Sequence, residues 1–538
     1  MRKLSTMFCA ALMSLSAMAT DYSGTLTVSV NGEEGAQPAT ISVVENAGKY
    51  NLSVNNFILV SGETTLPVGN IVVENVTGAV NEGLTTLYVD KNIQIQPGNA
   101  DGVAAEEWIG PMLGNVPVKM TSRFNADGFL AVDIDIDMQA VLGQTIKVQF
   151  ENVGDHFQMP NSDFETWSTA NNAPKHWHGF ESVKGGLAST AKSNTKLQAS
   201  NRIRPGSTGS KSAVATCSSV MGIIANGTLT NGILNAGSPI ATNAANHSET
   251  DLSSDAKDVN GDPFATPIYA KPDAVKFWAK FSQAKTVADF PYATFNAVLT
   301  DGTYYQDPED KAYSNKVAVA SNVPEKMGVG DWREVVRSFD YASYASNNVE
   351  AKAILMTFST NATPGKGSVE TTGSFFNQKV VAADSLFIDD LELVYLAGIK
   401  SIAFKGNALD LATIQNTGIQ LVEGESAAAS DFVVEKEGVD SKVTTLVEAA
   451  AEGYVAVITA VSADLKTTET YVINIKTPSA PVLKGDVDQN GVVDVTDVTV
   501  LINMILNSEA EASSVADVDE NGVVDVTDVT TLISLILG

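Results

Sequence analysis

Apolar and polar residues alternate in the stretch Tyr22-Ser-Gly-Thr-Leu-Thr-Val-Ser-Val30, and they alternate again in Ala131-Val-Asp-Ile-Asp-Ile-Asp-Met138. A period of two residues places one face of a strand in a core and the other face in water. Turn signals such as Asn31-Gly32 and Asp127-Gly128 separate the alternating stretches. The pattern over residues 21–152 therefore predicts an all-β segment of roughly eight short strands, which close into a barrel and leave no exposed edge.

This first segment resembles the calycin-like, or lipocalin-like, barrel domains of secreted Bacteroidetes proteins in its pattern and length. The resemblance implies a barrel fold and leaves the ligand of the barrel open. Asp133, Asp135 and Asp137 project from one face of their strand. We interpret this face as solvated, with a cation site as the alternative.

Two further segments also have the alternating pattern of strands. Residues 153–397 begin near Asn161-Ser-Asp-Phe-Glu-Thr-Trp167 and end near Ser385-Leu-Phe-Ile-Asp-Asp-Leu-Glu-Leu-Val-Tyr395, and they predict a jelly-roll β-sandwich with large loops. Residues 398–476 contain two alternating stretches around a turn at Ala463-Asp-Leu-Lys466 and predict an immunoglobulin-like β-sandwich. Residues 477–483 contain two prolines and are the expected linker to the tail.

The two ends of residues 153–397 look like the terminal strands of jelly-roll carbohydrate-binding modules. The segment is similar to the carbohydrate-metabolism domain of Bacteroidetes proteins. In such jelly rolls a glutamate of the first strand and an aspartate of the last strand often meet at a structural Ca²⁺. The resemblance therefore implies a second calcium site at Glu165 and Asp389 or Asp390, while exposed carboxylates at the strand ends are an equally open interpretation.

Aromatic residues of the same segment are the candidates for glycan contact, because the C–H groups of a sugar stack on aromatic faces. Those in predicted loops are expected to be available to a glycan, and they are Trp177, Tyr304 and Tyr305. The other tryptophans of the segment are expected in the core, and they are Trp167, Trp278 and Trp332.

The sequence offers few signs of catalysis or of transition-metal binding. His176 and His178 could hold a transition metal, but no third ligand stands at a recognisable spacing, so we interpret them as a surface pair. Asp389, Asp390 and Glu392 could act as the acids of a glycosidase, yet no spacing singles out a pair among the 63 acidic residues. The sequence has no G-x-S-x-G, H-E-x-x-H, P-loop or dinucleotide-binding motif, so catalytic residues stay unknown.

The C-terminal residues contain an internal repeat, because Gly485–Leu506 and Ala516–Leu537 are identical at 17 of 22 positions. Each copy has the pattern D-V-D-x-N-G-V-V-D-V-T-D, with oxygen ligands at loop positions 1, 3, 5, 7, 9 and 12. Ca²⁺ takes hard oxygen ligands, and a tight loop with glycine at position 6 turns alternate residues inward. The pattern predicts two Ca²⁺ sites, formed by Asp486, Asp488, Asn490, the carbonyl of Val492, Asp494 and Asp497, and by Asp517, Asp519, Asn521, the carbonyl of Val523, Asp525 and Asp528.

A helix is expected after each loop. Residues at helical spacing predict the buried faces, which are Val498, Leu501, Ile502 and Ile505 in the first copy and Val529, Leu532, Ile533 and Ile536 in the second. No amphipathic helix precedes either loop, which separates the repeat from an EF-hand pair. The duplicated loop and helix resemble type I dockerin domains. The resemblance implies a cohesin-like partner, which the residues at loop positions 10 and 11 help to select: Val495, Thr496, Val526 and Thr527.

The N-terminus and the net charge indicate where the protein works. Arg2 and Lys3 precede a mostly apolar run that ends in Ala17-Met18-Ala19, so residues 1–19 predict a signal peptide and a secreted or extracytoplasmic protein. The net charge of −29 argues against nucleic acid and anionic membranes as partners, and no membrane span is expected. Cys9 lies in the apolar run and Cys217 stands alone, which excludes a disulfide framework.

These features predict a secreted calcium-binding protein that takes part in polysaccharide binding or catabolism and docks a glycan-binding module to a cohesin-like partner. A glycoside hydrolase with its site in residues 153–397 is the first alternative, and a structural or adhesion protein of the surface is the second. The expected cofactors are two Ca²⁺ ions in the tail, with one structural Ca²⁺ in the jelly roll as a further candidate.

Overall fold

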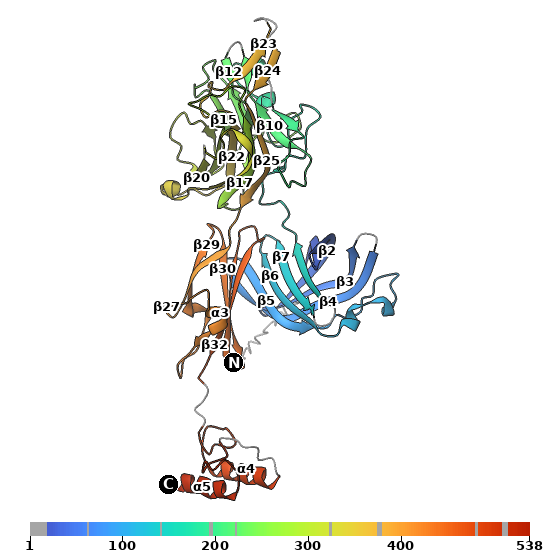
Figure 1. Cartoon of the computed structure of the whole chain (residues 1–538), viewed down its shortest axis with the longest axis vertical. Helices are drawn as coiled ribbons and strands as arrows, with labels where there is room; N and C mark the ends of the chain where they lie inside the picture. The colour runs from blue at the N-terminus through green and yellow to red at the C-terminus, as the bar shows by residue number, and fades with distance from the viewer. Residues whose placement is uncertain are drawn as a thin grey trace, which may run out of the picture. The chain divides into compact units, whose positions relative to one another are not determined.

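The computed structural model describes residues 19–61, 64–139, 143–192, 197–220, 223–321, 325–373, 379–478, 483–507 and 515–538. The expected signal peptide up to residue 18, with Cys9, and residues 479–482 of the expected linker lie outside these stretches. One compact unit holds Met1–Ser401, Val434–Thr444 and Ile458–Thr470, and a second holds Ile402–Val433, Thr445–Val457 and Tyr471–Gly538. Strands dominate the described chain and helices are few (Figure 1), so the expected mainly β architecture is confirmed.

Eight antiparallel strands form a closed barrel in which β1 pairs with both β2 and β8 (Figure 1). They are β1 (Ala19–Val30), β2 (Glu33–Asn46), β3 (Lys49–Ser61), β4 (Thr64–Asn81), β5 (Leu84–Ile93), β6 (Val116–Asn125), β7 (Leu130–Met138) and β8 (Gln144–Glu151). The predicted barrel is confirmed, but the prediction of short strands is wrong, since β4 alone has 18 residues. Register shifts between β3 and β4 allow such long strands to bend, and inward side chains such as Leu26, Leu87 and Met120 fill one core.

The outer wall of the barrel carries the three aspartates of β7. Asp135 and Asp137 are exposed, as expected for a solvated face. Asp133 is half-buried instead, because it forms an ion pair with Arg123 of β6. Arg123 is 2% exposed and its Nε donates to the carbonyl of Leu465 at 2.6 Å. Asp133 therefore holds a buried arginine and is only partly exposed on this face.

Two five-stranded sheets form a β-sandwich in the second segment. One has the order β21 (Gly330–Ser338), β17 (Ala274–Ser282), β25 (Ser385–Val394), β10 (Ser212–Thr216) and β9 (Leu197–Ser200). The other has the order β13 (Thr228–Thr230), β22 (Ala353–Ser359), β18 (Thr294–Thr300) and β20 (Lys316–Ser321), with β16 (Thr266–Pro267) paired to β22. The ring of Phe277 on β17 lies 4.9 Å from that of Phe295 and 5.0 Å from that of Phe358, so the two inner faces share one core.

A third, smaller sheet covers one outer face of this sandwich. It consists of β14 (Ile233–Ala236), β15 (Asn246–Thr250) and β19 (Tyr305–Asp307). Tyr305 of β19 packs with Val298 and Leu355 of the second sheet in a satellite hydrophobic cluster. The remaining elements of the segment are β11 (Ser218–Val220), β12 (Ile223–Ala225), β23 (Val369–Thr372), β24 (Lys379–Ala383), α2 (Ala188–Lys192) and the short 3₁₀ turns Phe180–Ser182 and Ala342–Asn347.

Two small sheets follow the sandwich in the chain. The first has the order β27 (Asn407–Ala408), β26 (Gly398–Phe404) and β29 (Phe432–Glu437). The second has the order β28 (Ile419–Gln420), β32 (Thr468–Lys476), β31 (Gly453–Val461) and β30 (Lys442–Ala450), in which β28 runs parallel to β32. The short helix α3 (Ile414–Thr417) precedes β28. The predicted pairing of the strands around Ala463–Lys466 is confirmed, because β31 and β32 are neighbours.

The tail contains two helices of equal length, α4 (Val495–Leu506) and α5 (Val526–Leu537). Each begins at position 10 of its acidic loop, and an aspartate caps each N-terminus: Asp494 accepts a hydrogen bond from the backbone N–H of Thr496, and Asp525 accepts one from Thr527. Val498, Leu501, Val529 and Leu532 form the small core that joins the two repeats. No helix in the described part of the chain combines the length and the hydropathy that crossing a membrane requires.

Candidate functional site

The two loops of the tail bring carboxylates together. Ligand oxygens of Asp486, Asp488 and Asp497 all lie within 4.8 Å of one another, and those of Asp517, Asp519 and Asp528 do the same in the second loop. These residues hold positions 1, 3 and 12 of the predicted calcium loops. The structure therefore groups half of the predicted ligands in each copy.

Backbone amides fix this arrangement. Asp486 accepts hydrogen bonds from the N–H groups of Asn490 (3.0 Å) and Gly491 (2.8 Å), and Gly491 has a φ of +86°, which favours glycine. Asp497 accepts from the N–H groups of Asp488 (3.0 Å) and Asp494 (2.8 Å) and is 0% exposed. Within the described residues, no lysine or arginine pairs with the three grouped aspartates. A buried carboxylate beside two others needs a positive charge, and a divalent cation fits this donor set.

The other predicted ligands lie along the same loops but outside the groups of three. The Asn490 side chain donates to Asp488 at 2.9 Å and accepts from the N–H of Val492 at 2.9 Å. The Asp494 carboxylate accepts the Thr496 N–H at 2.7 Å, so it acts as the cap of α4. The second loop repeats these bonds with Asn521, Val523, Asp525 and Thr527.

The predicted partner-binding positions are at the surface of the tail. Val495 is 69% exposed and Val526 is 66% exposed, although both are apolar. The hydroxyl of Thr496 donates to Asp494 at 2.6 Å and to Asp488 at 3.1 Å, which ties loop position 11 to a grouped carboxylate. The predicted burial of Ile502 and Ile533 is wrong, because these side chains are 39% and 40% exposed. The two helices pack along a stripe narrower than the one predicted.

The three acids of the calcium site predicted for the jelly roll are bonded by protein groups. Glu165 accepts hydrogen bonds from Ser210 and Lys211, and these outweigh its partial burial and lower the pKa of its carboxyl group. Asp389 accepts from the backbone N–H of Arg204 at 3.1 Å, and Asp390 pairs with the Arg204 guanidinium. Protein donors engage all three acids, and the described residues show no group of three metal-binding side chains here, so the calcium site at these residues stays a prediction.

Two of the three candidate glycan-binding aromatics are buried, so they are not available as expected. Trp177 is 0% exposed, its ring lies 5.3 Å from that of Phe164, and its Nε1 donates to the carbonyl of Pro160. Tyr305 is 1% exposed because the third sheet packs it against the sandwich. Tyr304 is 38% exposed, and its hydroxyl donates to Glu249 at 3.2 Å.

Two tryptophans expected in the core lie on an outer sheet face instead. Trp278 alternates with the inward Phe277 on β17 and is half-buried under the guanidinium of Arg204, whose carbon lies 5.3 Å from the ring centroid. Trp332 of β21 is also half-buried, and its ring lies 6.2 Å from that of Phe387. We call the rings of Trp278, Trp332 and Phe387, together with Arg202 and Arg204, the aromatic sheet face. The alternation in Val275–Phe281 carried this signal, because Phe277 and Trp278 cannot both point inward.

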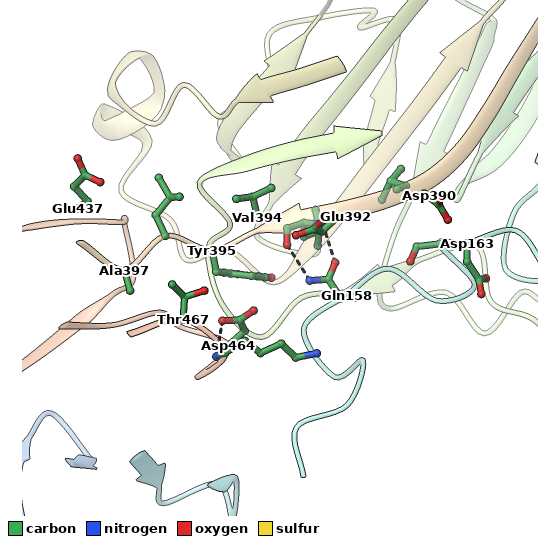
Figure 2. Close-up of a pocket in the computed structure, with 15 residues that line it drawn as sticks. Gln158, Asp163, Asp390, Glu392, Val394, Tyr395, Ala397, Glu437, Asp464 and Thr467 are labelled. Carbon is green, nitrogen blue, oxygen red and sulfur yellow. Dashed lines mark hydrogen bonds between the residues drawn. The ribbon is translucent and has the colours of Figure 1, made fainter. Parts of the chain in front are cut away.

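An acidic cleft of about 510 Å³ lies beside β25 (Figure 2). Its carboxylates are Asp163, Asp390, Glu392, Glu437 and Asp464. Two of them are already paired, since Asp390 contacts Arg204 and Glu392 lies 2.5 Å from Lys276 Nζ. Gln158 closes one wall by bonding both backbone groups of Leu393. Burial raises the pKa of the nearby Asp389 to about 6, but this carboxyl is 0% exposed and does not line the cleft.

His176 and His178 do not form the expected surface pair. His178 is 0% exposed, whereas the side chain of His176 is 37% exposed. The carboxylates of Asp258 and Asp262 lie beside these two imidazoles. Sequence spacing did not reveal this grouping, because the aspartates come from a distant loop.

Comparisons with known proteins identify two parts of the chain. Residues 18–153 match the model of the calycin-like beta-barrel domain, and residues 484–537 match that of the dockerin type I domain. No curated protein matches the chain. One similar solved structure is the N-terminal CBM22-1–CBM22-2 tandem domain of Xyn10C from Paenibacillus barcinonensis, with 11% identity and a TM-score of 0.19 over 70% of this chain and 92% of that one. A TM-score this low does not indicate a common fold. The chain therefore contains a calycin-like barrel domain and a type I dockerin domain.

Proposed function

We propose that this protein is a secreted, calcium-binding protein that docks a glycan-binding module to a cohesin-like partner and takes part in polysaccharide binding or catabolism. The observation that carries the proposal is the pair of acidic loops, each with three carboxylates within 4.8 Å, in the segment that matches a type I dockerin domain. Secretion rests on the signal-peptide pattern of residues 1–19.

Calcium is the cation that suits the loops. Their donors are carboxylate, amide and carbonyl oxygens, which Ca²⁺ prefers. Asp486, Asp488, Asn490, Val492, Asp494 and Asp497 would hold one ion, and Asp517, Asp519, Asn521, Val523, Asp525 and Asp528 would hold the other. A bound ion would neutralise the buried Asp497 or Asp528 and so stabilise the start of the following helix.

The docking surface is formed by the first turns of α4 and α5. Val495 and Val526 expose apolar side chains, and Thr496 and Thr527 lie beside them. Because the two repeats carry the same residues at these positions, either helix could contact the partner in the same way. Thr496 and Thr527 also bond the loop carboxylates Asp488 and Asp519, so calcium binding and partner binding are coupled.

The aromatic sheet face supports glycan binding by the sandwich. Half-buried rings such as Trp278 and Trp332 offer flat surfaces on which sugar C–H groups stack. Arg202, Arg204, Lys276 and Lys280 surround them with hydrogen-bond donors. Tyr304 remains a second candidate at a different place on the sandwich.

Docking is tested with the full mature chain and a panel of type I cohesin modules, in Ca²⁺ and in chelator. We expect binding in Ca²⁺ that falls by more than about 100-fold in chelator or in the Asp497→Asn, Asp528→Asn double variant, since structural metal binding and folding are coupled. The matched control is Asp135→Asn, which removes an exposed carboxylate of the barrel and should leave the affinity for cohesin unchanged. Equal binding with and without Ca²⁺ would contradict the proposal.

Glycan binding is tested by affinity electrophoresis of the same chain in gels that contain polysaccharides. We expect retardation that Trp278→Ala and Trp332→Ala reduce. Tyr269→Ala, which removes a 59% exposed ring elsewhere, is the control and should leave it unchanged. Release of reducing sugar would favour the glycoside hydrolase, and no retardation on any polysaccharide would favour the adhesion protein.

A further inference from the structure

One end of the aromatic sheet face places rings and basic side chains in a single row. Phe387 of β25 lies directly across from Lys280 of β17 in the antiparallel register. The ring of Trp332 on β21 lies 6.2 Å from the ring of Phe387, and the guanidinium carbon of Arg202 lies 5.6 Å from the centroid of the same ring. We call Trp332, Lys280, Phe387 and Arg202 the Phe387 row.

Arg202 contributes a guanidinium group that no carboxylate of the described chain engages. Its backbone is held in place, because its N–H donates to Ser200 Oγ at 3.0 Å and its carbonyl accepts from Ser212 Oγ at 2.9 Å. The side chain is exposed, and among the described residues its guanidinium makes no hydrogen bond or ion pair. Arg204 differs, since its guanidinium pairs with Asp390. Arg202 therefore offers its N–H donors to a ligand.

Lys280 contributes a second positive charge to the row. Its Nζ lies 2.6 Å from Asp331 Oδ1, but the side chain of Asp331 is 84% exposed. An ion pair with so exposed a partner contributes little to stability, because water screens both charges. A carboxylate that arrives from solution could share Lys280 with Asp331 at little cost.

The other carboxylates of this sheet face lie in neighbouring rows. Arg204 engages Asp389 and Asp390, Lys276 pairs with Glu392, and Glu334 lies across from Trp278. The Phe387 row itself has two basic side chains against one carboxylate, although the whole chain has a net charge of −29. At physiological ionic strength, charges more than about 8 Å away are largely screened. The local positive charge therefore decides which ligand the row favours.

We propose that the Phe387 row binds a uronic acid unit of an acidic polysaccharide and that Arg202 selects its carboxylate group. This inference rests on the proposed function, in which the aromatic sheet face binds a glycan. Trp332 offers a half-buried ring on which the C–H groups of the sugar stack. Arg202 binds the carboxylate through two parallel N–H···O bonds, the arrangement that guanidinium and carboxylate groups favour. Phe387 is 6% exposed, so it supports the Arg202 side chain and does not itself contact the sugar.

The test compares polyuronates with their own uncharged esters. The full mature chain is run in affinity gels that contain polygalacturonate or alginate, or the methyl ester of either polymer, and its mobility is compared with that in a gel without polymer. Chelator is present, so that Ca²⁺ cannot bridge the tail loops and the polyuronate. We expect at least one free acid to bind about tenfold more tightly than its ester, because hydrogen bonds between charged groups are stronger than neutral ones.

The outcomes separate this inference from the proposed function. Retardation by the esters or by neutral polysaccharides alone would overturn the selection of uronic acids and leave glycan binding intact. No retardation by any polysaccharide would contradict both. Displacement of the chain from polyuronate by poly-glutamate at equal charge concentration would also overturn the inference, since the sugar ring would then contribute nothing.

Variants of Arg202 test its role directly. Arg202→Gln should lower the affinity for the polyuronate by about tenfold or more and leave the affinity for the ester unchanged. Arg202→Lys keeps the charge but loses the planar fork, so its affinity should lie between those of the other two chains. Arg337→Gln is the matched control, because it removes an exposed arginine of β21 whose Nε donates to the carbonyl of Ser321 at 2.8 Å. An equal loss in Arg337→Gln would overturn the inference.

A second variant keeps the test decisive if Arg202→Gln does not fold. Lys280→Gln removes the other positive charge of the row, and it should lower the affinity for the polyuronate by a smaller factor, since Asp331 already shares that charge. Unchanged binding of polyuronate by both Lys280→Gln and Arg202→Lys would contradict the assignment of the carboxylate to this row.

Discussion

In the tail, the carboxylates that meet come from one run of twelve residues, whereas in the sandwich His176 and His178 meet Asp262 and Asp258 of a distant loop. The tail loop closes on itself, because Asp486 accepts hydrogen bonds from residues four and five positions later. The grouping in the sandwich depends instead on tertiary structure, in which the backbone of His178 pairs with that of Thr230 of β13. The contrast shows that side chains grouped by one local loop form a recognisable sequence motif, whereas side chains grouped by tertiary structure do not.

The comparison predicts that the grouped and ungrouped aspartates of one loop differ in their contribution to Ca²⁺ binding. Asp497→Ala removes a fully buried, grouped carboxylate, so we expect calorimetry of the full chain to count one Ca²⁺ in place of two. Asp494→Ala removes the cap of α4 and should retain two ions, at a cost of about 1 kcal/mol in helix stability. Equal loss of calcium in both variants would show that the cap residue is an essential ligand.

The next prediction compares a tryptophan in the core of the sandwich with a tryptophan on its outer sheet face. Trp177→Ala creates a cavity in the core and should lower the free energy of unfolding by about 3–5 kcal/mol. Trp278→Ala removes a half-buried ring and should cost less than about 1.5 kcal/mol. Exposure of the buried Cys217 to an alkylating agent along a urea gradient measures the unfolding of the sandwich by itself. Equal shifts for both variants would place Trp278 in the core after all.

Duplication of the tail predicts a smaller effect for a change in one repeat. Val495→Asp puts a charge on an exposed apolar position of α4, but α5 still presents Val526. We expect the single variant to lose less than about tenfold in cohesin affinity, roughly 1.4 kcal/mol. The double variant with Val526→Asp should lose binding. Surface plasmon resonance separates the cases, and complete loss in the single variant would mean that both helices are needed at once.

Sequence patterns predicted those parts of the fold and site that depend on neighbours in the chain. The alternation in Tyr22–Val30 and Ala131–Met138 gave the barrel strands, and the repeated D-x-D-x-N-G pattern gave the grouped carboxylates. The positions of Trp177 and Trp278 were predicted wrongly. Trp177 lies between two histidines in a predicted loop but is buried in the core, whereas Trp278 alternates with the inward Phe277 and lies on the outer face of the sheet.

The remaining errors come from contacts that only the folded chain creates. Arg204 engages Asp389 and Asp390, although nothing in its spacing from them indicates this. Tyr305 is buried because a third sheet covers it. The acidic neighbours of His176 and His178 were missed for the same reason, since Asp258 and Asp262 lie in a loop that the sandwich fold brings beside them.

The last prediction is that removal of calcium leaves the alkylation rate of Cys217 unchanged. It tests whether calcium stabilises the tail alone. Burial raises the pKa of the Cys217 thiol to about 11, and the sulfur contacts Thr360 and Asn361 at 3.0 Å, so the thiolate is scarce and shielded at pH 8. Chelation should unfold the tail, seen as lost helical circular dichroism, while alkylation of Cys217 stays as slow as in Ca²⁺. Full denaturant is the positive control for the reagent. Faster alkylation on chelation would mean that calcium also stabilises the sandwich, and the separation between the two regions would then fail.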